Sequence, residues 1–191
     1  MKNLLRPALT LFVLLSLICG VLYPFAITGI GQLAFPNEAN GSLVTRDGKL
    51  IGSALIGQSF SGATYFWSRP SATSPMPNNG IGSSGANLGP TNPALIDAIK
   101  GRVDALKAAD PSNSAPIPVD LVTASASGLD PEISVAAALY QSGRIARARQ
   151  LPQPVVQNLI ERQTLPQYFG FLGEPRVNVF ALNLQLDQVG H

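Results

Sequence analysis

The sequence contains almost none of the side chains on which many catalytic and metal centres depend. Its 191 residues include one cysteine, Cys19, and one histidine, His191. A single cysteine forms no intrachain disulfide. A Ser-His-Asp triad, a Cys-His nucleophile or a zinc site of His/Cys type needs these residue types inside the domain. Cys19 instead lies in a long apolar N-terminal run, and His191 is the last residue of the sequence. The composition therefore excludes these classes of active site.

Charged residues are also scarce, at 13% of the chain, and none lies between positions 7 and 38. Residues 8–30 are almost entirely apolar. As a helix they would rise roughly 34 Å, enough to cross a hydrocarbon core of about 30 Å. We expect one transmembrane helix over 8–33. Pro24 is expected to kink or end its regular part.

A cleaved signal peptide is the alternative to a retained anchor. Signal cores are usually shorter and end at a small-x-small site, and no such site follows closely here. Cys19 follows Ile18, which does not suit a lipoprotein signal. Lys2 and Arg6 precede the span, so the positive-inside rule places residues 1–7 in the cytoplasm and 34–191 outside. Ser16 and Gly20 stand four apart, which suits either close approach of another helix or contact with lipid.

After the span the formal charges nearly balance, so the basic isoelectric point is no argument for nucleic-acid binding. Asp47-Gly48 separates two apolar runs and predicts a hairpin over 42–56. The aromatic run 65–67 indicates core packing more than a ligand platform. Residues 80–85 match G-x-G-x-x-G but lack the strand and helix that a dinucleotide site requires, so we interpret them as a loop.

The remaining pattern predicts an α+β domain. Asn92 and Pro93 begin a helix with apolar residues at spacings of three and four. Residues 118–125 indicate a strand, Asp130-Pro131 the start of the next helix, 154–162 another helix, and 176–186 a closing central strand. The turn before Asp130 could form an anion site at a helix N-terminus, although Asp130 and Glu132 would repel an anion.

Several long motifs of the chain resemble the C subunit of the Kdp potassium-transporting ATPase, in that family's order and over nearly the full length. They are residues 5–8, 40–43, 52–58, 65–72, 86–93, 118–131 and 173–179. Ala126, Glu132 and Val135 stand where that family often has Gly, His and Pro.

The resemblance implies a non-catalytic accessory subunit in the inner (plasma) membrane. Its partners would be a potassium-selecting channel-like subunit, a P-type ATPase subunit and a short single-span subunit, together with membrane lipid. The subunit would support assembly and raise the pump's ATP affinity or turnover as a catalytic chaperone, with ATP and potassium bound by the complex. Candidate partner-packing residues are Ser16, Gly20, Arg69, Asn87, Asp130 and Arg176.

The family's proposed nucleotide contact maps onto Gln141. The charge rule places Gln141 outside the cell, whereas ATP is inside, so an effect on ATP affinity would have to cross the membrane as a coupling between conformational states. Direct ATP binding through Gln141 is one alternative. Another is an anchored extracytoplasmic hydrolase that uses a Ser-Lys pair such as Ser53 and Lys49.

Overall fold

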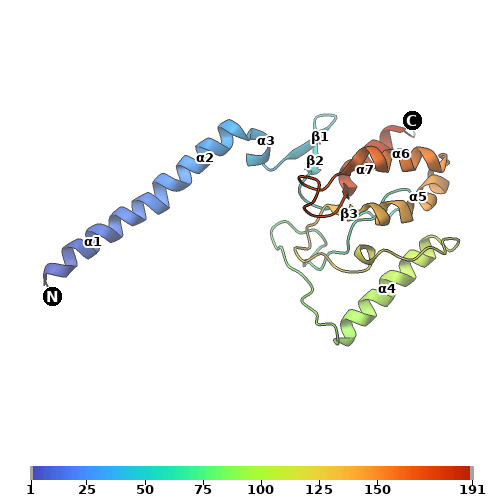
Figure 1. Ribbon diagram of the computed structural model, residues 1–191, viewed down its shortest axis with the longest axis horizontal. Coiled ribbons are helices and arrows are strands. Elements are labelled where there is room, and N and C mark those ends of the chain that lie inside the picture. The colour runs from blue at the N-terminus through green and yellow to red at the C-terminus, as the bar shows by residue number, and fades with distance from the viewer. Residues whose placement is uncertain (1, 190–191) are drawn as a thin grey trace. The chain divides into compact units, whose positions relative to one another are not determined.

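The computed structural model describes residues 2–189, and side chains from position 4 onward. The chain divides into two compact units, Met1–Ser53 and Ala54–His191. The first unit begins with helix α1 (Lys2–Leu17), the π-helical segment η1 (Ile18–Leu22) and helix α2 (Tyr23–Ala34) in uninterrupted succession (Figure 1). Residues Leu4–Ala34 are long and apolar enough to cross a membrane, with a mean hydropathy of 2.3. The single N-terminal apolar helix is therefore confirmed.

The helix does not end at Pro24, contrary to one of the two outcomes expected for it. Proline lacks the N–H group that would bond to the carbonyl four residues earlier, and its ring crowds that turn. The wider π-helical turn lies directly before Tyr23 and accommodates this defect, so α2 continues to Ala34.

The predicted hairpin follows the short helix α3 (Pro36–Ala39). Strand β1 (Leu43–Arg46) pairs antiparallel with β2 (Lys49–Ser53), and Arg46 lies opposite Lys49. Asp47 and Gly48 have φ values of 51° and 74°, which a two-residue type I′ turn requires. Strand β2 ends at Ser53, three residues before the end of the apolar run that predicted it.

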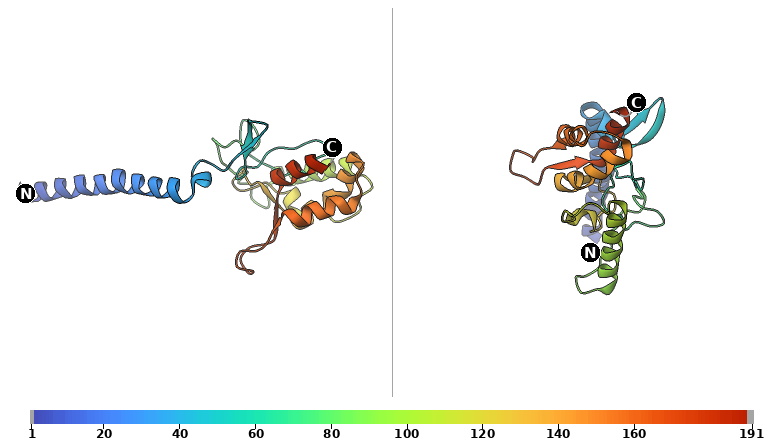
Figure 2. Two further views of the ribbon diagram at one scale, coloured as in Figure 1. Left: turned by 90° about the horizontal axis from the view of Figure 1, so that it is seen from above. Right: turned by 90° about the vertical axis from the view of Figure 1, so that its right-hand side faces the viewer.

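The second unit is mixed α+β, as predicted. Its helices are α4 (Pro93–Ala109), α5 (Val135–Arg149), α6 (Gln153–Gln163) and α7 (Val179–Val189), and the short 3₁₀ helix η2 covers Val119–Leu121. Strands β3 (Glu132–Ser134), β4 (Thr164–Leu165) and β5 (Arg176–Asn178) form one antiparallel sheet in the order β3-β5-β4. Figures 1 and 2 show α5, α6 and α7 gathered beside this sheet.

One hydrophobic core fills the space between these helices and the sheet. Its fully buried members come from every layer, including Phe66 from a loop, Ile133 from β3, Ile145 from α5, Ile160 from α6, Val177 from β5 and Leu182 from α7. Residues 54–92 contain no helix or strand. Since part of this stretch is buried, its backbone polar groups need partners from elsewhere.

The predicted strand over 118–125 is wrong. Local hydrogen bonds compete with strand pairing there: the Thr123 hydroxyl donates to the Val119 carbonyl (2.8 Å), and Asp120 binds the backbone N–H of Ser134 (2.7 Å). The next helix also begins later than predicted, because residues after Asp130-Pro131 first pair with β5. Its N-cap is Ser134, whose hydroxyl accepts from the Ala137 N–H (3.0 Å).

The closing strand is only partly correct, because β5 ends at Asn178 and α7 follows. The Asn178 side chain accepts from the Ala181 N–H (3.0 Å) and caps that helix. The buried side chains at 179, 182, 183 and 186 recur with helical spacing. An eleven-residue strand would also be unusually long.

Candidate functional site

The best-connected polar site surrounds a loop in the second unit, Gly62–Trp67, here called the braced segment. Gln141 on α5 is 1% exposed and uses its whole amide group. Its carbonyl oxygen accepts from the Trp67 N–H and from Arg144, both at 2.8 Å. Its amino group donates to the carbonyls of Trp67 (3.1 Å) and Ala137 (3.3 Å). All four hydrogen-bonding positions of the amide are therefore occupied within the chain.

Asn183 on α7 binds the preceding residue in the same way. Its carbonyl oxygen accepts from the Phe66 N–H (2.9 Å), and its amino group donates to the Phe66 carbonyl (3.0 Å). Two buried amides thus pair with two consecutive backbone units, much as a neighbouring strand would. Phe66 is completely buried, so these bonds satisfy backbone groups that water does not reach.

Two arginines on α5 bind the other carbonyls of the braced segment. Arg144 donates to the carbonyls of Ala63 (2.5 Å) and Tyr65 (3.0 Å), and its guanidinium lies 4.6 Å from the centre of the Trp67 ring. Arg149 donates to the Thr64 carbonyl (2.7 Å) and stacks on Tyr65. Burial lowers the pKa of Arg144 to about 10, partly offset by the charge of Asp110, so Arg144 stays a cation at neutral pH.

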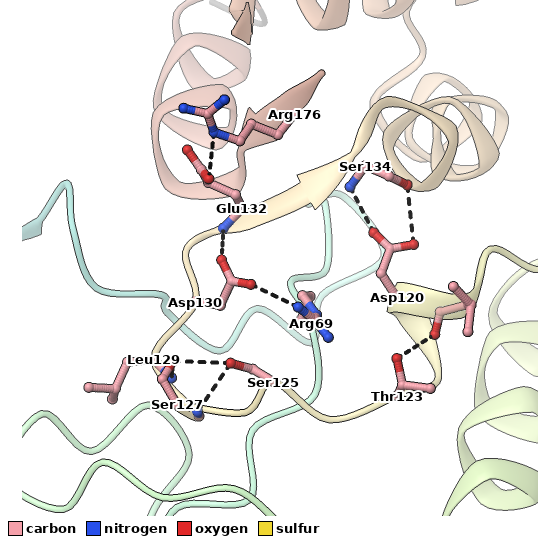
Figure 3. A network of polar contacts seen from close by, with 12 residues as sticks. Arg69, Asp120, Thr123, Ser125, Ser127, Leu129, Asp130, Glu132, Ser134 and Arg176 are labelled. Atoms are coloured by element: carbon pink, nitrogen blue, oxygen red, sulfur yellow. Dashed lines mark hydrogen bonds and ion pairs between the residues drawn. The ribbon is translucent and has the colours of Figure 1, made fainter. Parts of the chain in front are cut away.

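Three of the predicted partner-packing residues belong to one polar chain, which we call the relay (Figure 3). Arg69 forms an ion pair with Asp130 at 2.9 Å. The other oxygen of Asp130 accepts from the Glu132 N–H at 3.0 Å. The Glu132 carboxylate pairs with Arg176 at 2.8 Å, and Arg176 stacks on Tyr168 with 4.5 Å between its guanidinium carbon and the ring centre. The relay leads from Arg69, two residues after the braced segment, to the loop after β4.

The other predicted residues lie apart from this site. Asn87 is exposed in the loop before α4 and has a φ of 51°. Ser16 and Gly20 are exposed on the N-terminal helix, and the π-helical segment begins between them. Their role in packing stays a prediction.

The start of α5 offers no open anion site of the kind considered for that turn. The Ser134 hydroxyl occupies one helix-end N–H, and Asp120 accepts from both the N–H and the hydroxyl of Ser134 (2.7 and 3.2 Å). Asp130 and Glu132 are engaged in the relay. The helix end is therefore capped by the chain's own oxygens.

The Ser-Lys alternative loses its geometric basis. Lys49 and Ser53 lie four residues apart on β2, about 13 Å along an extended strand. The Ser53 hydroxyl donates to the Gly41 carbonyl (2.7 Å), and Lys49 is exposed. A base must lie within hydrogen-bond reach of the hydroxyl that it activates.

A cavity of about 400 Å³ lies beside the braced segment, between Trp67, Arg69 and the α4 residues Arg102 and Leu106. Arg102 donates to the Val122 carbonyl (2.8 Å), and burial lowers its pKa. Two arginines on an apolar wall are suited to a small anion, but Arg69 is already paired and its Nε is buried. Within residues 2–189 no cluster of three or more His, Cys, Asp or Glu residues is arranged to hold a metal ion. His191 lies outside the described residues.

Sequence reasoning missed Asn183 and the role of Arg144. Asn183 lies in the part of the predicted closing strand that is helix α7 in the structure. A usable signal existed for Asn183: one polar residue at a helical spacing among apolar ones indicates a buried amide with a specific partner.

The fold and the site define an α+β protein with one N-terminal helix long and apolar enough to cross a membrane, and with buried polar side chains that bind the backbone of its own loops. The family model described as KdpC, the K+-transporting ATPase c chain, matches residues 5–188, and the chain belongs to this family. It is 68% identical to the potassium-transporting ATPase KdpC subunit of Herminiimonas arsenicoxydans over 98% of this chain and 99% of that protein. The KdpC subunit of Janthinobacterium sp. (strain Marseille) is 65% identical over 98% of this chain and all of that protein. That of Methylococcus capsulatus is 60% identical, with 98% of each chain covered.

Proposed function

We propose that this chain is a non-catalytic accessory subunit of an ATP-driven potassium uptake complex. Residues 1–7 lie in the cytoplasm, 8–33 span the inner (plasma) membrane, and 34–191 lie outside. The relatives' names support the complex, and Lys2 and Arg6 before the span support the orientation. The outer domain rests on the extracytoplasmic mouth of the potassium-selecting, channel-like subunit. The P-type ATPase subunit and the short single-span subunit complete the assembly.

One observation carries the non-catalytic assignment: the side chains of the site serve the chain's own backbone. Gln141 binds the backbone of Trp67, and Asn183 binds the backbone of Phe66. Arg144 binds the carbonyls that precede them. A catalytic group needs a free lone pair or proton at an accessible atom. The buried amides keep neither. Potassium and ATP are accordingly bound by the complex and not by these residues.

An influence on ATP affinity acts through the membrane. If Gln141 lies outside, it contacts no cytoplasmic nucleotide, and the effect is a coupling free energy between two conformational states of the pump. The subunit raises ATP affinity by binding one of those states more tightly than the other.

Two experiments test this function. Alkaline phosphatase is active only outside the cytoplasm, so its fusion to the C-terminus should be active, whereas a reporter active only in the cytoplasm should be silent. A deletion strain without other high-affinity uptake systems should fail to grow at micromolar potassium and recover with the wild-type chain. Cytoplasmic activity of the fusion, or normal growth of the deletion strain, contradicts the proposal.

Direct nucleotide contact is tested separately by photocrosslinking. An azido-ATP analogue added to the purified complex should label the P-type subunit and leave this chain unlabelled. Labelling of this chain near Gln141, competed by ATP, would contradict transmission through the membrane. A Gln141→Ala variant alone does not distinguish direct contact from transmission through the membrane, because the substitution should lower ATP affinity under either mechanism.

A further inference from the structure

The loop between β4 and β5, Pro166–Pro175, exposes an unusual amount of apolar surface. We call it the aromatic hairpin. Phe169 and Phe171 are 87% and 73% exposed, and Tyr168 and Leu172 are also exposed. Residues 166–173 carry no charge. In both views of Figure 2 the hairpin projects beyond the helices of the second unit. Clustered exposed aromatics of this kind mark interaction sites.

The hairpin is an ordered element. Tyr168 and Leu172 exchange two backbone hydrogen bonds of 2.9 Å each, and the Gln167 side chain donates to the Gly173 carbonyl (2.7 Å). Phe169 has a φ of 53°, which is uncommon for a bulky residue and costs free energy. This strained backbone holds the Phe169 ring in solvent, so burial of the ring within the chain does not offset the cost. A partner that buries the ring would offset it.

The relay fixes the base of the hairpin. Arg176 stacks on Tyr168, pairs with Glu132 and donates to the Pro166 carbonyl (3.3 Å). Through Glu132 and Asp130 the hairpin is connected to Arg69. Three of the six partner-packing candidates predicted from sequence, Arg69, Asp130 and Arg176, thus help to hold the hairpin in place. A pre-ordered binding element loses little entropy on association.

Charge beside the hairpin indicates what kind of surface it meets. Glu161 and Glu174 border a hollow of about 710 Å³ at its base, together with Pro166 and Pro175. Both carboxylates are exposed and form no ion pair within the described residues 4–189. The footprint therefore combines an uncharged aromatic tip with two unpaired negative charges.

We propose that the aromatic hairpin inserts into an apolar pocket on another subunit of the potassium-transporting ATPase, and that a lysine or arginine at the edge of that pocket meets Glu161 and Glu174. Phe169 and Phe171 are the anchors. Aromatic anchors in desolvated pockets carry most of the energy of such contacts, and complementary charges at the rim guide association. This inference rests on the proposed function as an accessory subunit.

A bilayer is the less suitable occupant. Segments that insert at the membrane interface place Lys and Arg beside their apolar residues, since the lipid surface is often anionic. Here the unpaired charges bordering the base of the hairpin are acidic, and Arg176 is already engaged with Glu132. Lipid contact is therefore an outcome of the test that would contradict the inference.

The first test is photocrosslinking in the intact complex. The photoreactive residue p-benzoyl-phenylalanine is introduced in place of Phe169 in the full-length chain, and at Ile81 as a control. Ile81 is fully exposed in a different loop. We expect position 169 to give one discrete adduct with another subunit, and position 81 to give none at that site.

The second test measures the affinity of the purified full-length chain for a complex isolated without it, in detergent. The double variant Phe169→Ser/Phe171→Ser should bind at least about 30-fold more weakly, which corresponds to about 2 kcal/mol for the loss of an anchor. Glu161→Lys/Glu174→Lys should bind about 10-fold more weakly and show a reduced dependence on salt.

Matched controls separate docking from folding. Ile81→Ser removes an equally exposed apolar side chain, and Asp97→Lys/Asp104→Lys reverses two exposed charges on α4. Both should bind like the wild type. All variants should unfold at the wild-type urea concentration, since the altered side chains are exposed.

The outcomes distinguish this inference from the proposed function. If the wild-type chain binds the complex but position 169 crosslinks only to lipid or to nothing, or if the Phe variant binds normally, the inference is wrong and the accessory function stands. If the wild-type chain does not bind the complex at all, the proposed function fails first.

Discussion

Replacing Gln141 by leucine tests whether its hydrogen bonds, rather than its volume, stabilise the second unit. Leucine fills a similar space but pairs with nothing, so the N–H and carbonyl of Trp67 lose their partners and Arg144 loses an acceptor. Leaving a buried backbone group unpaired costs about 1–3 kcal/mol. With two such groups, we expect Gln141→Leu to lower the free energy of unfolding by about 3 kcal/mol. Gln141→Ala should cost somewhat more, because it also leaves a cavity.

Trp67 is the only tryptophan of the chain and lies directly at the altered contact, so its fluorescence reports the effect. Urea unfolding of the full-length protein in detergent, followed by this emission, gives the free energy of unfolding. Gln157→Ala is the matched control: it shortens an exposed glutamine on α6 and should change stability by less than about 0.5 kcal/mol. A stability of Gln141→Leu equal to that of the wild type would refute the bracing role.

Three further predictions follow from the same structure. Asn183→Ala should lower the free energy of unfolding by roughly 3 kcal/mol, because it leaves both backbone polar groups of Phe66 unpaired; a urea titration measures this. Ser134→Ala should cost about 1 kcal/mol through loss of the α5 N-cap, while Ser134→Asp should recover most of it in the same titration. Tyr140→Phe should reduce the loss of stability at alkaline pH. Burial, and then the charge of Asp110, raise the pKa of Tyr140, so above about pH 10 the unfolded phenol loses its proton while the folded one keeps it, and stability falls. Unfolding of both proteins at pH 8 and pH 11 checks this; an equal loss in the two would contradict it.

Elements with strong local signals could be predicted from sequence. The uncharged N-terminal run, the Asp47-Gly48 turn and the Asn92-Pro93 helix start each depend on neighbours within a few residues. Elements whose conformation depends on distant partners could not. Residues 118–125 fold back because Asp120 binds Ser134, and no local pattern indicates that contact.

The same division applies to the site. Arg69, Asp130 and Arg176 could be singled out by residue type and motif, and the structure places them in one relay. That Gln141 and Asn183 pair with neighbouring residues could not be predicted, because the contacts join α5 and α7 to a loop 74 and 117 residues earlier. A buried loop without regular structure must find such partners, but the sequence does not say which side chains supply them.

The bracing contacts and the relay form one connected path, and this bears on how Gln141 could influence ATP affinity. Gln141 binds Trp67, two residues before Arg69, and the relay continues from Arg69 through Asp130 and Glu132 to the base of the aromatic hairpin. If the hairpin binds a partner subunit, a substitution at Gln141 alters how firmly the hairpin is held in place for that contact. No nucleotide needs to lie near Gln141 for this effect. In a pump with two conformational states, an altered contact with this subunit changes the relative stability of the two states. If the proposed docking is correct, it alone would lower the ATP affinity of a complex that carries a Gln141 variant. Only photocrosslinked adducts that locate the nucleotide would then distinguish this effect from direct contact.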